Sequence, residues 1–211
     1  MAALVRLAVT ADFWRTVAAS LGRVLLGLML GTALALPLTA LTLRSRWCGA
    51  VISPMMTVIR CTPVASFIML LWLLAGRDAV PQVIALLMVL PVLWQALRDG
   101  WAHRDRELSE LLTVFDAGGL RRLRLLVLPT LRVPFLTGLS TAAGLAWKSG
   151  IAAEIIAYTS CSVGRKISDA RNLFEGPEMM AWTVCVVLLS LLLDRAIRLL
   201  SDRLKGGAGH D

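Results

Sequence analysis

The chain has 211 residues, of which 57% are apolar and 17% are charged. Soluble domains are roughly 45–50% apolar, so this composition indicates a membrane protein. Its 22 basic and 14 acidic residues give a net charge of +8, but the basic residues lie in the gaps between long apolar runs rather than on one soluble face, which argues against nucleic acid as a partner.

Residues 1–19 form a segment that we expect on the outer side of the membrane, at its interface. Arg6, Asp12 and Arg15 interrupt the apolar run, so the segment has no signal-peptide core. Phe13 and Trp14 are of the residue types that anchor a chain at a membrane interface. The insertion signal is therefore expected to be a helix that is retained.

Five apolar stretches are long enough to cross a bilayer, which takes about 20 residues of helix. They cover residues 21–43, 51–75, 79–97, 133–158 and 177–193. We expect them to form one membrane domain over residues 20–200. Gly27 and Gly31 form a GxxxG pattern in the first stretch, which favours close contact with another helix. Prolines in the second and third stretches predict kinks or broken turns at Pro54, Pro63, Pro81 and Pro91.

The basic residues of the loops predict the orientation of these spans. Thirteen of them fall on one side of the membrane and six on the other. Cytoplasmic loops collect lysine and arginine, so we expect the N-terminus outside and the C-terminus, with a tail over residues 201–211, in the cytoplasm. The longest loop, residues 98–132, then lies on the cytoplasmic side.

This long loop is too polar to span the membrane and too patterned to be a passive linker. An apolar stripe at helical spacing predicts a short amphipathic helix carrying Leu108, Leu111, Leu112 and Phe115. Gly118 and Gly119 end this helix, and a second helical stretch, residues 120–128, is expected to end at Pro129. The residues alone leave two uses of this helix–turn–helix open, which are contact with anionic lipid and docking of a protein.

The stretch from Glu110 to Pro129 resembles the EAA loop of bacterial ABC importer permeases. That loop has the form EAA, three residues, G, nine residues, I, one residue, LP, and the spacing from Glu110 to Pro129 matches it without a gap. This chain differs at the paired alanines, which are Leu111 and Leu112, and at the glycine, where it has Asp116. Both differences concern the local geometry of the turn.

Other segments are similar to the nitrate, sulfonate and taurine (NitT/TauT) branch of these permeases. The segment from Arg60 to Pro63 resembles an Arg-Pro-x-Pro motif, and residues 152–154 and 163–171 resemble the end of the penultimate helix and the outer loop after it. The resemblance covers about residues 20–205. It implies the all-α fold of type I ABC importer permeases, with five transmembrane helices and a cytoplasmic coupling loop, and without the further N-terminal span that many members carry.

The resemblance also implies partners and a location. It implies a pair of permeases in the bacterial cytoplasmic (inner) membrane, two ABC ATPase subunits that bind ATP and Mg²⁺, and an extracytoplasmic binding protein that delivers a small solute. The sequence leaves open whether the chain pairs with itself or with a related chain, and one elbow in each chain favours a homodimer. The chain has no GxxxxGK[ST] phosphate loop, so we expect a transport subunit rather than an enzyme, with no cofactor of its own. By transfer of the motif, the residues that couple it to the ATPase are Glu110, Leu111, Leu112, Phe115, Asp116, Gly118 and Pro129.

Arg60, Lys148 and Glu154 are charged residues at membrane depth and are candidates for the translocation path or its gate. Such residues are costly in lipid and face a bundle interior or a wet cavity. Glu154 lies six residues after Lys148, about 9 Å along a helix and on a different face, so a direct pair between them is not expected. For Lys148 the residues leave open a cavity role, attracting an anionic or polar solute, and a structural role.

Other function classes find little support in the sequence. The four cysteines form no CxxC pair and there are two histidines, which argues against a metal site and a disulfide framework. No serine or cysteine lies in a nucleophile-like turn, which argues against a membrane-embedded acyltransferase or protease. A gradient-driven secondary transporter or channel is the alternative, although that class usually has internal repeats and has no need of a docking helix.

Overall fold

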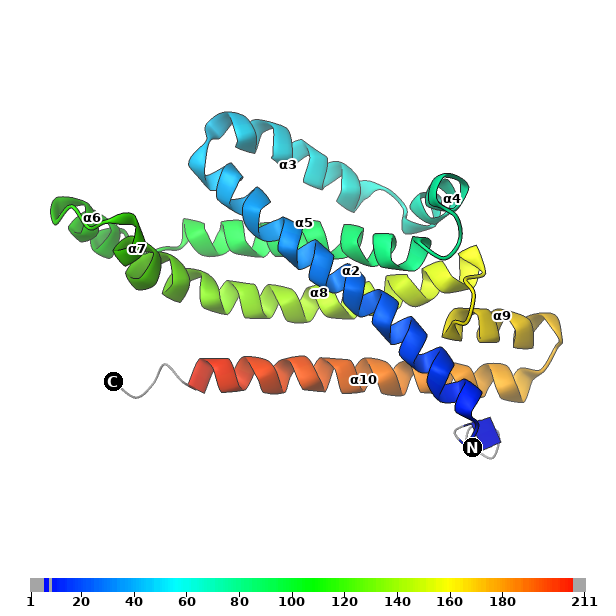
Figure 1. The fold of residues 1–211 in the computed structure, drawn as a ribbon. Helices are drawn as coiled ribbons and strands as arrows, with labels where there is room; N and C mark the ends of the chain where they lie inside the picture. Colours follow the sequence, from blue (N-terminus) through cyan, green and yellow to red (C-terminus); the bar gives the residue numbers. More distant parts are fainter. Residues whose placement is uncertain (1–5, 8, 207–211) are drawn as a thin grey trace.

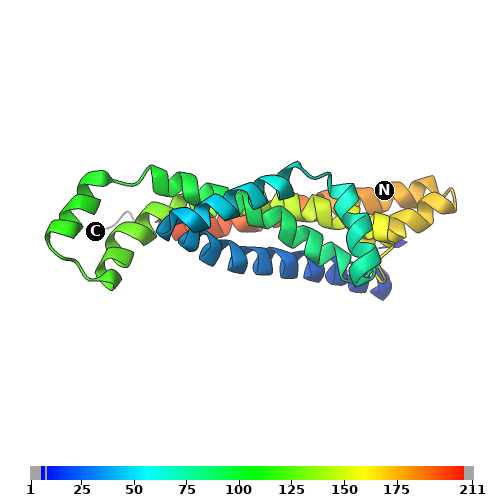
Figure 2. The ribbon, with the colours of Figure 1, turned by 90° about the horizontal axis from the view of Figure 1, so that it is seen from above.

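The computed structural model describes residues 6, 7 and 9–206, with side chains as far as residue 199. All secondary structure in this part of the chain is helical. The long helices run beside one another as an elongated bundle, with an elbow of short helices at one end and α9 (Val163–Asn172) at the other (Figures 1 and 2). Of the expected tail over residues 201–211, the helix α10 (Gly176–Gly206) includes the first part, and residues 207–211 lie outside the described residues.

The first span is the helix α2 (Ala11–Arg44), which is longer than expected. Thr10 caps its start, because the Thr10 hydroxyl accepts a hydrogen bond of 3.4 Å from the backbone N–H of Phe13. Its 34 residues reach about 51 Å at 1.5 Å per residue, beyond the roughly 30 Å of a hydrocarbon core. Residues 11–19 of the segment expected at the interface are thus the first turns of this helix, and residues 1–5 and 8 lie outside the described part.

The second predicted span is broken into two helices. They are α3 (Arg46–Cys61) and α4 (Val64–Ala75), and they meet at an angle of 100°. Pro63 stands at the break, because its ring prevents the chain from continuing the preceding helix. The chain stays helical through Pro54 and Pro91, and Pro81 lies in the first turn of α5 (Val80–Ala102), where a missing N–H costs nothing.

The loop between the third and fourth spans forms the elbow. It consists of α6 (Arg106–Val114), α7 (Gly119–Arg122) and the π-helical turn η1 (Leu123–Val127). This turn runs directly into α8 (Leu128–Ala157), so the prediction that Pro129 ends the second helical stretch is wrong. The backbone N–H of Leu128 donates to the carbonyl of Leu123, five residues earlier, and this change of register just before Pro129 accommodates the proline in the first turn of α8.

By length and composition, four helical stretches of the described chain can cross a membrane, and the bent α3–α4 pair makes five if it counts as one span. The central helix is α5, which packs against both α2 and α8. Ile84, Ala85, Val89 and Leu93 of α5 are completely buried. The expected all-α membrane fold is therefore confirmed.

The GxxxG pattern of α2 lies at its contact with α5. A Cβ atom added at Gly27 would stand 2.4 Å from the carbonyl oxygen of Gln82, and one at Gly31 would stand 2.8 Å from Cβ of Val89. Only glycine allows the two backbones to come this close. The helix contact predicted from the pattern is confirmed.

Candidate coupling surface and intramembrane charges

The elbow turns at Asp116, between α6 and α7. Asp105 caps the start of α6 by accepting a hydrogen bond of 3.1 Å from the N–H of Leu108, and the chain leaves the helix at Asp116 with φ at +45°. This left-handed conformation is cheapest for glycine, and aspartate is one of the few other residues that adopt it readily. Asp116 stands at the glycine position of the EAA motif, so the backbone keeps the turn that a glycine would favour.

Contacts within the elbow hold α6 against the helical turns that follow it. The guanidinium of Arg122 donates a hydrogen bond of 2.8 Å to the hydroxyl of Thr113 across the turn. Leu112 and Leu126 are 5% and 1% exposed and are buried inside the chain. The inner side of the elbow is thus covered by other parts of the chain and is not available to a partner.

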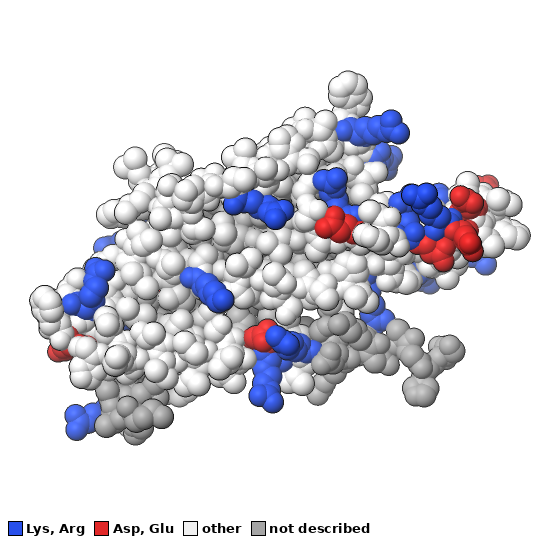
Figure 3. Space-filling view, turned by 180° about the vertical axis from the view of Figure 1, so that it is seen from behind, with Lys and Arg blue, Asp and Glu red and all other residues white. Residues whose placement is uncertain are grey.

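The outer side of the elbow is apolar and exposed. Four side chains make up what we call the elbow surface: Leu111, Val114, Phe115 and Leu120, which are 53%, 82%, 73% and 67% exposed. Leu112 was expected among the coupling residues but is buried within the chain. Val114 was not part of the apolar stripe predicted from the sequence but is exposed on the elbow surface. Glu110 is exposed on the same helix. Figure 3 shows acidic and basic side chains crowded over this end of the molecule and isolated charges along the rest of that face.

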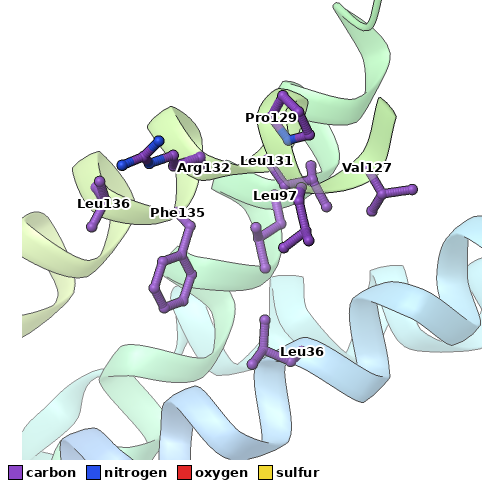
Figure 4. Close-up of a pocket in the computed structure, with 9 residues that line it drawn as sticks. Leu36, Leu97, Val127, Pro129, Leu131, Arg132, Phe135 and Leu136 are labelled. Carbon is purple, nitrogen blue, oxygen red and sulfur yellow. The ribbon is translucent and has the colours of Figure 1, made fainter. Parts of the chain in front are cut away.

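Two further expected coupling residues, Gly118 and Pro129, are not part of this surface. Gly118 is exposed with an ordinary negative φ, and a Cβ atom added there would meet nothing within 4 Å. Pro129 borders a cavity of about 760 Å³ where α2, α5 and α8 meet (Figure 4). Leu36, Leu97 and Phe135 line that cavity, and Arg132 is the one charged residue of its lining. The guanidinium of Arg132 is therefore the one side-chain group of this lining that could bind a polar solute.

Glu154 is completely buried at the opposite end of the bundle, where α2, α8 and α9 meet. Its Oε2 atom accepts a hydrogen bond of 2.9 Å from the hydroxyl of Ser20 and one of 3.1 Å from the N–H of Gly164. Nη1 of Arg23 lies 3.6 Å from Oε1 of Glu154. We call these four residues the clasp, because they join three helices through one carboxylate.

The clasp extends into the turn between α8 and α9. The guanidinium of Arg23 donates to the carbonyl oxygens of Ser160 and Cys161 at 2.7 and 3.2 Å. Sequence reasoning missed Arg23 and Ser20 as partners of Glu154. The available signal was the depth of each residue in the membrane. The first span starts and the fourth span ends on the same side of the membrane, so Arg23 and Glu154 are expected at a similar depth.

Neighbouring contacts at this end are polar as well. The ammonium of Lys166 in α9 lies 2.7 Å from a carboxylate oxygen of Asp12 in α2. The N–H of Ser160 donates a hydrogen bond of 2.9 Å to the carboxylate of Asp78, and this bond holds the pKa of Asp78 below its ordinary value. The turn before α5 and the turn after α8 are thereby linked.

Arg60 and Lys148 lie apart from the clasp. Arg60 is exposed in the last turn of α3, directly before the break at Pro63. Lys148 is exposed on α8 and borders a small cavity toward α10. Among the described residues no ion pair joins Arg60, Lys148 and Glu154 to one another, and Glu154 pairs with Arg23 instead.

Known proteins are similar to this chain in sequence and in fold. Residues 18–206 match the family model described as binding-protein-dependent transport system inner membrane component. The chain is 30% identical over 190 residues to a probable ABC transporter permease of Brucella melitensis, covering 88% of this chain and 76% of that one. It is 24% identical over 196 residues to the taurine transport system permease protein TauC of Escherichia coli, covering 92% and 70%. A crystal structure of an amino acid ABC transporter with histidines has the same fold, with a TM-score of 0.74 over 91% of this chain and 93% of that one, at 13% identity.

Proposed function

The chain belongs to the family of binding-protein-dependent transport system inner membrane components and is a permease subunit of an ABC importer, and we propose that its elbow couples solute movement to ATP hydrolysis on a separate subunit. The elbow surface is the observation that supports this coupling role. Exposed apolar patches of this kind mark protein interfaces, and a short amphipathic helix fits into a groove on a partner.

The charges of the elbow favour a protein partner over lipid. Glu110 and Asp116 are exposed beside the apolar side chains of the elbow surface, and over residues 105–124 four acidic residues balance four basic ones. The elbow therefore lacks the net positive charge that anionic lipid headgroups attract. The elbow also extends beyond the end of the bundle rather than lying across its side (Figure 1). Glu110 and the nearby arginines then form the charged rim of an apolar contact.

The connections of the elbow allow movement to be transmitted. It joins α5 through three residues, 103–105, and runs into α8 without any loop at all. A displacement of the elbow by an ATPase subunit would therefore tilt α5 and α8, which pack on each other, as rods. Gly118 and Pro129 lie at the two ends of the segment that would carry this movement.

The rest of the proposed assembly follows from this assignment. The elbow and the C-terminus lie in the cytoplasm and the N-terminus outside a bacterial inner membrane. Two copies of the chain pair with two ATPase subunits that bind ATP and Mg²⁺, and an external binding protein delivers a small solute at the α9 end. Arg60 and Lys148 face the translocation path or its gate, and Glu154 acts at the gate by fixing the α9 end through the clasp.

Two exposed phenylalanines at opposite ends allow a matched test. Phe115 is 73% exposed on the elbow surface, and Phe174 is 94% exposed in the turn before α10. The permease is purified with its ATPase subunits, and bound ATPase and ATP hydrolysis are measured for Phe115→Asp, Leu111→Asp and Phe174→Asp. We expect both elbow variants to lose the ATPase subunit and Phe174→Asp to retain it. Retention of a fully active ATPase by both elbow variants would refute the coupling role.

A further inference from the structure

The cavity beside Pro129 is open to the surroundings of the bundle. Its volume of about 760 Å³ falls within the roughly 300–1,000 Å³ of ligand pockets. Leu36 of α2 and Leu128 of α8, both in its lining, are 47% and 57% exposed. Figure 4 shows the ring of Phe135 extending from α8 toward α2, where Leu36 lies. A molecule with an apolar part can therefore enter the cavity from outside the chain.

The cavity lies at the depth where lipid headgroups meet acyl chains. Ala157, at the far end of α8, precedes a polar turn in which Ser160 donates to Asp78, so this end of the helix lies at one edge of the hydrocarbon core. Arg132 lies 25 residues before Ala157, which is about 38 Å at 1.5 Å per residue. The hydrocarbon core is about 30 Å thick, and about 40–45 Å with both headgroup regions. Arg132 is therefore at the level of the headgroups on the elbow side, and Phe135, one turn closer to Ala157, is where the acyl chains begin.

The charge of Arg132 has no counter-ion in the cavity. Arg132 is the one charged residue of the lining, and no ion pair joins it to another residue of the described chain. Asp99 and Asp105 line a different cavity, together with Pro134. Pro134 is 200° around α8 from Arg132, so that acidic cavity is on the opposite face of the helix. The cavity of Arg132 thus attracts an anion.

The two kinds of group in the lining fit an amphiphile with an anionic head. A guanidinium binds two oxygens of a phosphate at once, whereas the other eight residues of the lining are apolar and fit a hydrocarbon chain. Basic pockets between transmembrane helices on the cytoplasmic side, where we place the elbow, bind lipid headgroups in this way. The molecule of this chemistry that a membrane supplies at this depth is a phospholipid.

We propose that the cavity binds an anionic phospholipid, with its phosphate on the guanidinium of Arg132 and the upper part of an acyl chain between Phe135 and Leu36. The lipid contacts α2, α5 and α8 together, beside the turn η1 through which the elbow joins α8. This inference goes beyond the coupling role, because it holds whichever partner the elbow surface binds.

Lipid binding by the purified transporter tests the proposal. The permease is purified in its native complex and titrated in detergent with phosphatidylglycerol, which is anionic, or phosphatidylcholine, which is zwitterionic, and bound lipids are counted by native mass spectrometry. The variants are Arg132→Gln, Arg132→Lys and Leu36→Trp. Arg195→Gln is the matched control, because Arg195 is exposed on α10 at the same end of the bundle and is not part of the lining (Figure 1).

We expect the native complex to bind phosphatidylglycerol more tightly than phosphatidylcholine. Arg132→Gln should weaken the binding of phosphatidylglycerol by about tenfold, the effect of losing one hydrogen bond to a charged group. Arg132→Lys should keep most of the affinity, since an ammonium also attracts a phosphate. Leu36→Trp should weaken binding because the indole takes the space of the acyl chain. Arg195→Gln should change the affinity by less than about twofold, because one exposed charge contributes little.

A phosphatidylglycerol with a photoreactive diazirine near the top of one acyl chain locates the site on the native chain. We expect its adducts on residues that line the cavity, and their loss in Leu36→Trp. Adducts confined to residues outside the cavity would overturn the proposal, and this result needs no variant that has to fold. Equal weakening by Arg132→Gln and Arg195→Gln would overturn it as well, since the lipid would then respond to surface charge alone. Displacement of the lipid by glycerol phosphate, which has no acyl chain, would assign the site to a free phosphate instead.

Discussion

The clasp and the elbow surface, at opposite ends of the bundle, satisfy their side chains in opposite ways. At the α9 end, the carboxylate of Glu154 is fully buried and meets donors from α2 and α9. At the elbow, Phe115 and Val114 are 73% and 82% exposed and lack apolar cover. Buried polar groups that the chain satisfies itself stabilise the fold, whereas apolar groups left exposed are available to a partner. The comparison separates a buried polar junction, the clasp, from an exposed apolar patch, the elbow surface.

The largest effect expected from this comparison is on the stability of the clasp. Glu154→Ala removes the acceptor of Ser20 and Gly164 and leaves Arg23 without its carboxylate, so we expect the free energy of unfolding to fall by about 3–5 kcal/mol. Glu110→Ala, at the elbow, should change it by less than about 0.5 kcal/mol because Glu110 is exposed. Denaturant unfolding of both variants in detergent measures the difference. Equal losses for the two would remove the distinction between the ends.

Two glycines extend the comparison to packing. A Cβ atom at Gly164 would stand 2.4 Å from Cβ of Glu154 and 2.8 Å from its backbone carbonyl carbon, so Gly164→Ala should cost about 1–3 kcal/mol. Gly118→Ala meets open space with an allowed φ and should be neutral or stabilise the chain by up to about 1 kcal/mol. Thermal unfolding distinguishes these outcomes. A destabilisation by Gly118→Ala as large as that by Gly164→Ala would show that the elbow is packed more tightly than this structure has it.

Asp116 is the one non-glycine residue of the elbow with a positive φ. The direction in which a substitution there changes stability can therefore be predicted. Asp116→Val should destabilise the turn by about 1–2 kcal/mol, because a β-branched residue resists a φ of +45°. Asp116→Gly should be tolerated, since glycine adopts this conformation freely. Binding of the ATPase subunit reports on the turn: it should weaken with valine and persist with glycine. Unaltered binding with valine would mean that the turn does not shape the elbow surface.

The features that sequence predicted well are those set by local periodicity. The apolar runs gave the spans, the stripe at helical spacing gave α6, and the small residues Gly27 and Gly31 gave the contact with α5. Pro129 misled the prediction because the π-helical turn before it, which no local pattern signals, accommodates the proline. In the clasp, membrane depth could have paired Arg23 with Glu154. The hydrogen bond from Ser20 to Glu154 could not be derived, since it joins residues 134 positions apart and depends on how the helices pack.

The smallest expected effect is a pH dependence at the α9 end. Asp78 accepts a hydrogen bond from Ser160, and its pKa is lowered, so the bond stabilises the fold above the pKa of an unfolded aspartate, about 3.9. That stability is lost as the pH falls through the lower pKa of the folded state. Asp78→Asn should therefore flatten the acid end of a stability–pH curve slightly, because the group is mostly exposed. If the stability of Asp78→Asn falls with decreasing pH as that of the native chain does, other carboxylates cause the pH dependence.

Docking of the elbow surface on an ATPase subunit can be detected by a crosslink from position 115 itself. A photoreactive benzoylphenylalanine is placed at position 115, and at 174 as the control, in cells that contain the whole transporter, and the adducts are identified by mass spectrometry. We expect an adduct between position 115 and a subunit with a GxxxxGK[ST] nucleotide-binding loop, and none with that subunit from position 174. Adducts from position 115 to lipid alone would contradict it and make the elbow a membrane-surface helix.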